Sequence, residues 1–346
     1  MLKPTDPELH ALPKAELHVH LDGSLRPRTM VELAKERDVS LPATEPAALA
    51  DHMLVSDAHG LEDYLARFVL TLSLMQDAPA LERIAFELVA DHAAENVRYA
   101  EIRFCPALNT QGGLTPDEVM DAVLAGLRRG DAEFGVTSRV IVCGLRTLDP
   151  TVSTTMAELA VAYAPEGVVA FDLAGAEAGY PVHEHLEAFR VAREADLPIT
   201  VHAGEGFGAP SIHEAVHLAR ARRIGHGTRL FEDPELETLV RDSGIPLEVC
   251  LTSNVQTGVA PSYGQHPARR YFGEGIPVAL CTDNRLMSGV TLTDEYRHAR
   301  DYLGFSREEL VQVARTGFER AWVGEAERRS LTDQFDAEVA KLAQLG

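Results

Sequence analysis

The sequence is short of cysteine and has no long apolar run, and each shortage excludes a class of protein. Its four cysteines, Cys105, Cys143, Cys250 and Cys281, lie far apart in no C-x-x-C spacing, so we expect reduced thiols rather than a disulfide framework. No stretch reaches the roughly 18 apolar residues of a membrane span. The first residues also lack a cationic start followed by an apolar segment. These features predict a cytoplasmic protein without a membrane partner.

Positive charge is scarce as well. The 346 residues include 32 Lys and Arg against 53 Asp and Glu, a formal net charge of −21. A field of this sign repels nucleic acid and anionic lipid. We therefore expect a small-molecule partner and no nucleic-acid partner.

Eight short apolar runs rich in β-branched residues alternate with segments of helical period. Strands that alternate with helices predict a parallel sheet, and eight such units predict an α/β fold of the TIM-type (β/α)8 barrel class. The runs cover residues 15–21, 97–104, 137–145, 167–175, 198–205, 222–230, 246–254 and 277–284.

One connection is too long for a single helix. Residues 22–96 include two helical segments, 61–75 and 79–95, and we expect this insertion after the first strand to cap the barrel mouth as a helical lid. Residues 293–346 are expected to be helices that complete the outer ring. No linker, repeat or low-complexity tract divides the chain, so residues 1–346 are predicted to form one domain.

Potential metal ligands gather at the carboxyl ends of the runs, where barrels of this type build their active sites. His18 and His20 are two residues apart, so their side chains share one face of a strand. His202, with Glu205 three residues later, ends the fifth run. The ordinary alternative is that these are core histidines whose hydrogen bonds are satisfied by neighbouring groups. However, burial of polar side chains at several strand ends costs free energy, and such a cost is typical of a functional site.

The sixth run carries His226 and the eighth ends in Asp283. Three imidazoles and a carboxylate suit Zn²⁺ with one position left for water, whose pKa the metal lowers toward about 7. Glu205 and His226 then remain as proton-transfer groups.

A second zinc pattern competes with this hypothesis. Residues 213–217 read His-Glu-x-x-His, the motif of zinc peptidases, with both histidines on one face of a probable helix. The segment falls between the fifth and sixth strands, where the barrel prediction makes it an outer helix, and no third ligand follows at close spacing. The zinc peptidase stays as a remote alternative.

Five motifs resemble the adenosine deaminase branch of the amidohydrolase superfamily: PKAELHVHLDGS (13–24), FDLAGAE (171–177), VHAGE (201–205), IGHGTRL (224–230) and CTDN (281–284). The resemblance implies that His18, His20, His202 and Asp283 hold one zinc ion. It implies that Glu205 is the acid at purine N1, and that His226 and Asp283 orient the activated water that attacks C6. It also implies that His20 and the backbone of Gly175 contact the substrate, the latter at N3.

Two positions bear on the substrate. Many members of the family have two consecutive aspartates where this chain has Asp283 and Asn284. The second faces purine N7, an acceptor to which the Asn284 amide can donate directly. Asp22 resembles the aspartate that contacts the ribose 5′-hydroxyl in nucleoside deaminases, and its charge disfavours a 5′-phosphate.

The resemblance therefore implies hydrolytic deamination of adenosine and 2′-deoxyadenosine to inosine and 2′-deoxyinosine, with Zn²⁺ and no organic cofactor. Free adenine and 6-aminodeoxyfutalosine are the alternative substrates within the class. A barrel that binds a purine without turning it over is a third possibility, although every expected catalytic residue type is present.

Overall fold

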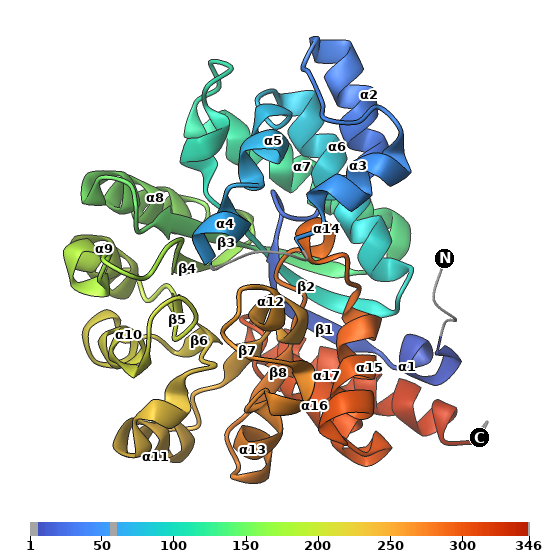
Figure 1. Ribbon diagram of the computed structural model, residues 1–346, viewed down its shortest axis with the longest axis vertical. Coiled ribbons are helices and arrows are strands. Elements are labelled where there is room, and N and C mark those ends of the chain that lie inside the picture. Colours follow the sequence, from blue (N-terminus) through green and yellow to red (C-terminus); the bar gives the residue numbers. More distant parts are fainter. Residues whose placement is uncertain (1–5, 56–60, 345–346) are drawn as a thin grey trace.

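The computed structural model describes residues 6–55 and 61–344, and within them the chain alternates between strands and helices around a central barrel (Figure 1). All eight expected strands are present. They are β1 Lys14–His20, β2 Val97–Phe104, β3 Thr137–Leu145, β4 Val168–Ala174, β5 Thr200–Ala203, β6 Arg223–His226, β7 Leu247–Val249 and β8 Val278–Leu280.

The last two strands are shorter than the apolar runs that predicted them. After Val249 the chain turns at Cys250 into the short helix α12 (Leu251–Gln256), so the residues after the turn leave the sheet. After Leu280 it passes through Asp283 into α14 (Arg285–Ser288). Both runs extended past the end of the strand, and the residues that follow each strand remain buried although they leave the sheet.

The strands form two parallel four-stranded sheets, β1-β2-β3-β4 and β5-β6-β7-β8. Single parallel bridges join the two sheets at both seams, Phe171 to Ile199 between β4 and β5, and Val19 to Asp283 between β1 and the residues after β8. The arrangement confirms the TIM-type barrel.

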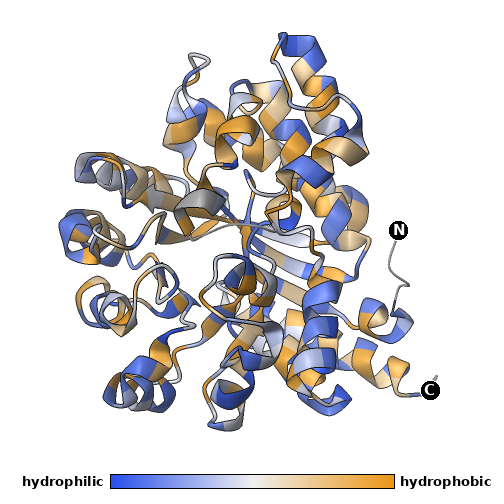
Figure 2. Ribbon diagram, viewed as in Figure 1, coloured by the Kyte–Doolittle hydropathy of each residue, from blue (hydrophilic) through white to orange (hydrophobic). Residues whose placement is uncertain are grey.

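Helices surround the strands (Figure 1). In Figure 2 these helices carry hydrophilic and hydrophobic residues side by side, as expected where one face packs on the barrel and the other meets water. The connecting helices are α7 Pro116–Phe134, α8 Pro150–Ala162, α9 Leu186–Glu194, α10 Ala209–Glu214, α11 Pro234–Asp242 and α13 Ala268–Gly273. The closing segment forms α15 Leu292–Leu303, α16 Arg307–Glu319 and α17 Glu325–Leu342, as expected, and α1 Pro7–Ala11 precedes the first strand.

Local sequence explains where these helices begin. Thr115 caps α7 in a capping box with Glu118, and a proline occupies the first turn. Asp149 and Asp233 accept backbone N–H groups at the start of α8 and α11 in the same way.

The long insertion is helical, but its helices belong to two parts of the fold, the wall of the central cavity and the outer ring. Its helices are α2 Pro27–Arg37, α3 Pro46–Met53, α4 Leu61–Leu65, α5 Phe68–Ser73 and α6 Ala78–Ala93, while residues 56–60 lie outside the described part of the chain. Among the described helices of the insertion, α4 and α5 are the ones that contribute side chains to the wall of the central cavity. Helix α6 packs beside α7 and belongs to the outer ring, so the lid is smaller than the predicted range 22–96.

The predicted single helix over 61–75 is wrong. The chain turns at residues 66–67 and divides the segment into α4 and α5. At the turn Arg67 donates to the carbonyl of His52 at 2.9 Å, and Leu65 and Phe68 on either side both reach the same cavity. Helical periodicity continues across the break, which explains why the pattern did not reveal it.

No helix in the described part of the chain has both the length and the apolar character that a bilayer crossing requires. The four cysteines are free and buried.

Candidate active site

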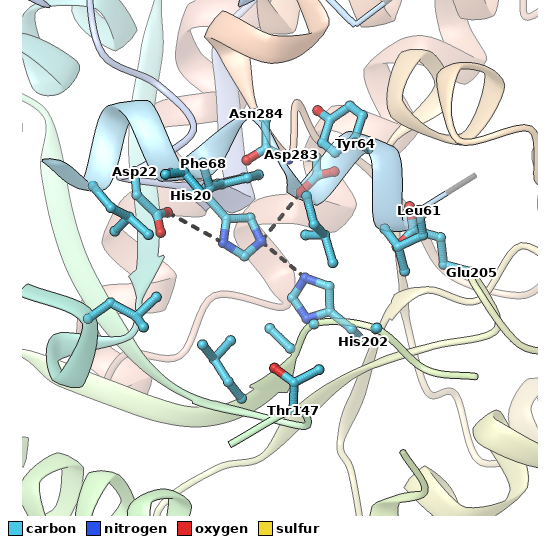
Figure 3. Close-up of a pocket in the computed structure, with 18 of the residues that line it drawn as sticks. His20, Asp22, Leu61, Tyr64, Phe68, Thr147, His202, Glu205, Asp283 and Asn284 are labelled. Atoms are coloured by element: carbon cyan, nitrogen blue, oxygen red, sulfur yellow. Dashed lines mark hydrogen bonds and ion pairs between the residues drawn. The ribbon is translucent and has the colours of Figure 1, made fainter. Parts of the chain in front are cut away.

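A cavity of about 230 Å³ opens at the carboxyl ends of the strands, beneath α4 and α5 (Figure 3). Nearly all of the residues that the sequence singled out line it, and His18 lies buried just beneath it. The lining residues among them are His20, Asp22, Gly175, His202, Glu205, His226, Asp283 and Asn284. The structure therefore brings the predicted residues to one place.

Four potential metal ligands meet at the base of this cavity. The Nε2 atom of His20 lies 3.0 Å from Nε2 of His202 and 3.4 Å from Oδ1 of Asp283 (Figure 3). The Nε2 atom of His18 lies 3.4 Å from the same Oδ1. Three imidazole nitrogens and one carboxylate oxygen thus point at a common centre, which is the donor set that Zn²⁺ favours.

The backbone at the β1/β8 seam fixes this meeting point. Asp283 donates its N–H to the carbonyl of His18 at 2.9 Å, and its own carbonyl accepts the N–H of His20 at 2.7 Å. Asp283 and His226 both have left-handed backbone, with φ of 60° and 63°. Non-glycine residues rarely adopt that conformation, and it is concentrated at functional sites that the surrounding structure holds in place.

Buried carboxylates hold the outer nitrogens of two of the histidines. Oε2 of Glu248 lies 3.0 Å from Nδ1 of His18, and Oδ2 of Asp172 lies 2.9 Å from Nδ1 of His202. At His18, an N–H donated from Nδ1 to Glu248 leaves the Nε2 lone pair free to bind a metal. At His202 the contact with Asp172 is an ion pair without a hydrogen bond. Arg103 joins the two carboxylates, with contacts of 3.0 Å to Asp172 and 2.8 Å to Glu248.

The sequence analysis missed these supporting residues, although a signal was present. Arg103, Asp172 and Glu248 are charged residues within apolar strands, and their side chains are fully buried. Buried charges are stable only when paired, so charges within β2, β4 and β7 should have predicted an ionic network inside the barrel.

Unpartnered polar atoms show where a cation would fit. Nε2 of His18 and Nε2 of His226 are buried without a hydrogen-bond partner. Within the described residues, the ligand atoms of His18, His202, His226 and Asp283 all lie within 4.8 Å of one another. This set includes His226 where the sequence predicted His20, so five groups surround the centre and their geometry fits a bound metal.

Burial favours the uncharged forms of Glu205 and His226. Nε2 of His226 lies 3.4 Å from Oε2 of Glu205. Burial, reinforced by the charges of Asp283 and Glu177, raises the pKa of the Glu205 carboxyl well above its usual range. Burial, with the neighbouring His18, lowers the pKa of His226 well below its usual range. A protonated carboxyl at neutral pH is what a general acid needs.

Glu177 holds the loop that carries Glu205. Its carboxylate accepts three consecutive backbone N–H groups, from Gly204 at 3.0 Å, Glu205 at 2.8 Å and Gly206 at 3.1 Å. Glu177 ends one of the motifs quoted above, but that motif did not indicate its role.

The upper wall of the cavity is apolar and comes from the lid. Tyr64 adds a hydroxyl that hydrogen-bonds Oγ of Ser288 at 2.8 Å. The other lid residues are Leu61, Leu65, Phe68, Val69 and Leu72. A planar, weakly polar ring would find apolar contacts here and polar groups only at its edges.

Asn284 and Asp22, at the cavity edge, have different surroundings. The backbone of Gly23 passes so near to Asn284 that a Cβ on Gly23 would lie 1.9 Å from Oδ1 of Asn284. Any larger residue at position 23 would displace the amide. Oδ1 of Asp22 is buried without a hydrogen bond, 4.0 Å from Nδ1 of His20, and burial raises the pKa of Asp22 to about 7.

The peptidase motif lies elsewhere. His213 ends up on α10 and His217 on the π-helix η4 (Ala215–Ala219), at the barrel periphery (Figure 1). The Glu214 carboxylate is engaged by His183, whose Nδ1 lies 2.8 Å from Oε1. Among the described residues, neither histidine belongs to a group of three or more potential ligands.

Comparison with known proteins identifies relatives along most of the chain. The adenosine deaminase family model matches residues 13–338. A protein named adenosine deaminase from Mycobacteroides abscessus is 47% identical over 74% of this chain and 75% of its own length. A probable adenosine deaminase from Dictyostelium discoideum is 41% identical over 90% of this chain, which spans 40% of that longer protein.

Solved structures share the fold. An adenine deaminase from Arthrobacter aurescens matches with a TM-score of 0.88 and 25% identity over 95% of this chain and 99% of its own. A zinc-bound amidohydrolase from Burkholderia ambifaria matches with a TM-score of 0.87 and 27% identity, over 99% and 96% of the two chains. The Arabidopsis protein ADAL, in complex with IMP, matches with a TM-score of 0.86 and 29% identity over 96% and 98%.

Proposed function

Because the chain belongs to the adenosine deaminase family, we propose that it hydrolyses adenosine and 2′-deoxyadenosine to inosine and 2′-deoxyinosine with release of ammonia. The observation that carries this proposal is the cavity itself. It combines four converging metal ligands, a buried carboxyl of raised pKa, and an apolar wall that suits a purine ring.

We propose Zn²⁺ as the metal, held by His18, His20, His202 and Asp283. The donor set, and the carboxylates behind His18 and His202, support this assignment. When bound, the zinc ion supplies a water of lowered pKa, so that the nucleophile ionises near neutral pH. His226 remains outside the ligand set in this proposal because its Nδ1 faces an amide rather than a carboxylate.

Glu205 is the proposed general acid. Attack at C6 opens the C6=N1 π bond and so breaks the aromaticity of the ring, and the electron pair that moves onto N1 must receive a proton. The raised pKa of Glu205 favours the protonated carboxyl that can donate this proton. Glu177 holds the loop that carries this donor by accepting three backbone N–H groups. The lid excludes water, which prevents proton exchange with solvent.

The remaining edges of the purine have proposed partners at the cavity wall. The Asn284 amide is the donor to N7, and the backbone of Gly175 contacts N3. Gly175 has φ of 96°, a left-handed conformation that turns the backbone at the end of β4. His20 and Asp22 lie on the side where a ribose would project, with Asp22 as the acceptor for the 5′-hydroxyl.

The cytoplasm is the proposed compartment, and a single domain over residues 1–346 is the proposed organisation. The four buried free thiols agree with reducing surroundings.

Ammonia release by the zinc-loaded protein tests the substrate assignment. We would compare kcat/KM for adenosine, 2′-deoxyadenosine, adenine, 6-aminodeoxyfutalosine and AMP under identical conditions. A lead of adenosine or 2′-deoxyadenosine by at least tenfold is expected. Adenine or 6-aminodeoxyfutalosine in first place would move the assignment within the class, and no ammonia from any of the five would overturn the proposed deamination.

A further inference from the structure

A series of buried, hydrogen-bonded side chains contacts His226 on the side away from the cavity. Asn254, on α12, places Nδ2 at 3.0 Å from Nδ1 of His226. Its Oδ1 lies 3.1 Å from Nε2 of His266, which lies just before α13. His266 in turn lies 3.1 Å from the backbone nitrogen of Ala268. Asn254, His266 and His226 are all nearly inaccessible to solvent.

The backbone end of this series sets the direction of every hydrogen bond in it. The N–H of Ala268 can only donate, so Nδ1 of His266 must accept. Burial lowers the pKa of His266 to about 3, and the ring is neutral with its single proton on Nε2. That N–H points at Asn254 and requires an acceptor there.

The acceptor can only be the amide oxygen of Asn254. The same Oδ1 accepts the hydroxyl of Thr228 at 2.7 Å, so two neighbours place the oxygen on the side away from His226. The amide nitrogen is therefore left facing His226, and an amide nitrogen is a donor only. The orientation of Asn254 thus follows from its partners.

This orientation decides where the proton of His226 lies. With Nδ1 accepting from Asn254, a proton on Nδ1 would face another donor at 3.0 Å. The neutral ring carries its proton on Nε2 instead, the nitrogen that faces Oε2 of Glu205 at 3.4 Å. A doubly protonated ring is disfavoured for the same reason.

We propose that Asn254 is a positioning residue that holds His226 in the Nε2–H form, with His266 and the Ala268 backbone fixing the direction of the Asn254 amide. This inference rests on the proposed deamination and adds to it the direction of one hydrogen bond. His226 donates to the attacking water, and it does not remove a proton from that water. The alternative, a packing role for Asn254, predicts no effect on the tautomer.

A nearly isosteric substitution at position 254 can reverse the hydrogen-bonding role of the group that faces Nδ1 of His226, from donor to acceptor. In Asn254→Asp, one carboxylate oxygen still accepts from His266 and Thr228, while the other accepts where the amide donated. An acceptor opposite Nδ1 draws the His226 proton to that atom and reverses the tautomer. Thr228→Val is the matched control, because it removes a neighbour of the Asn254 oxygen but leaves the series from Ala268 to His226 intact.

Two-bond ¹H–¹⁵N spectra of the zinc-loaded protein, labelled with ¹⁵N-histidine, read the tautomer directly, and His226→Asn assigns the resonance. We expect the Nε2–H pattern in the parent protein and in Thr228→Val, and the Nδ1–H pattern in Asn254→Asp. The reversal should lower kcat about 10- to 100-fold, as loss of an orienting partner does, with KM changed less than twofold to threefold.

An Nδ1–H pattern in the parent protein would overturn the proposal, and so would an unchanged tautomer and kcat in Asn254→Asp. If Asn254→Asp fails to fold, the spectrum of the parent protein still decides. If the protein shows the Nε2–H pattern but deaminates no purine, the proposed tautomer of His226 stands and only the proposed function is refuted.

Discussion

The carboxylate of Glu177 accepts the backbone N–H of Glu205 at 2.8 Å, so one glutamate positions another at the cavity wall. The same carboxylate also accepts the N–H groups on either side of Glu205. The proposed proton donor is thus positioned by a residue that does not itself reach the metal centre.

Glu177→Gln should weaken both the loop and the reaction. The amide keeps one acceptor oxygen and turns its NH₂ group toward a backbone N–H, which leaves a buried donor unsatisfied at a cost of about 1–3 kcal/mol. We expect that loss in urea unfolding, and a fall in kcat of about 10²-fold because the donor is displaced. Glu184→Gln on η3 (Val182–His185) is the charge-matched control. Unchanged kcat in Glu177→Gln would remove Glu177 from a positioning role.

Glu205→Gln should retain its metal and lose most of its turnover. Glutamine cannot supply a proton to N1, and removal of a general acid costs about 10²- to 10⁴-fold in rate. Zinc content by atomic emission should match that of the parent protein. A near-normal kcat would show that the proton comes from another group.

Asp22→Ala should discriminate between nucleosides and the free base. Only a nucleoside has a 5′-hydroxyl to lose, and a hydrogen bond to a charged group contributes about 1.5–3 kcal/mol. We expect kcat/KM for adenosine to fall about 10- to 100-fold while that for adenine changes little. Equal losses on both substrates would contradict the sugar contact.

Metal binding should depend on the central histidines and not on the surface motif. His202→Asn should lose zinc and unfold at a lower temperature than the zinc-loaded parent, because a metal that binds only the folded state stabilises it. The double variant His213→Ala, His217→Ala should keep both zinc and deaminase activity. Loss of zinc from the double variant would instead favour the surface motif as the metal site, as the peptidase hypothesis predicts.

Glu295 should make the protein less stable as pH rises. It is fully buried on α15 and accepts the N–H of Thr252 at 3.1 Å. Burial raises its pKa to about 8 in the folded protein. Because the folded state holds this proton more tightly than the unfolded state does, stability is lost between about pH 4.5 and pH 8, at up to about 1.4 kcal/mol per pH unit.

The variant Glu295→Gln isolates that contribution. Its urea-unfolding free energy should fall less than that of the parent between pH 5 and pH 8, while Glu133→Gln, at an exposed site on α7, should follow the parent. Parallel pH profiles for Glu295→Gln and the parent would show that Glu295 is ionised in the folded state.

The position of the site could be predicted from the sequence because a parallel barrel presents the ends of all its strands at one face. His18, His202, His226 and Asp283 each stand near the carboxyl end of a strand or just beyond it, and the structure gathers them there. The individual roles of these residues stay predictions, since the distances alone do not distinguish His20 from His226 as a ligand.

The supporting residues could not be placed in the same way. Glu177 acts through the backbone of a loop, and Asn254 acts through the turn after β7, where a run of buried residues resembled a longer strand. The break between α4 and α5 was also missed, because it depends on the cavity beneath the helices and on a contact from Arg67 to the segment before them.

The seam between β1 and β8 has a consequence for biosynthesis. His18 and His20 leave the ribosome early and Asp283 late, yet their backbones must pair before the ligand set exists. Contacts between such distant segments form slowly. A nascent chain therefore has no complete metal centre until its eighth strand has docked, and zinc retention can serve as a reporter of finished folding.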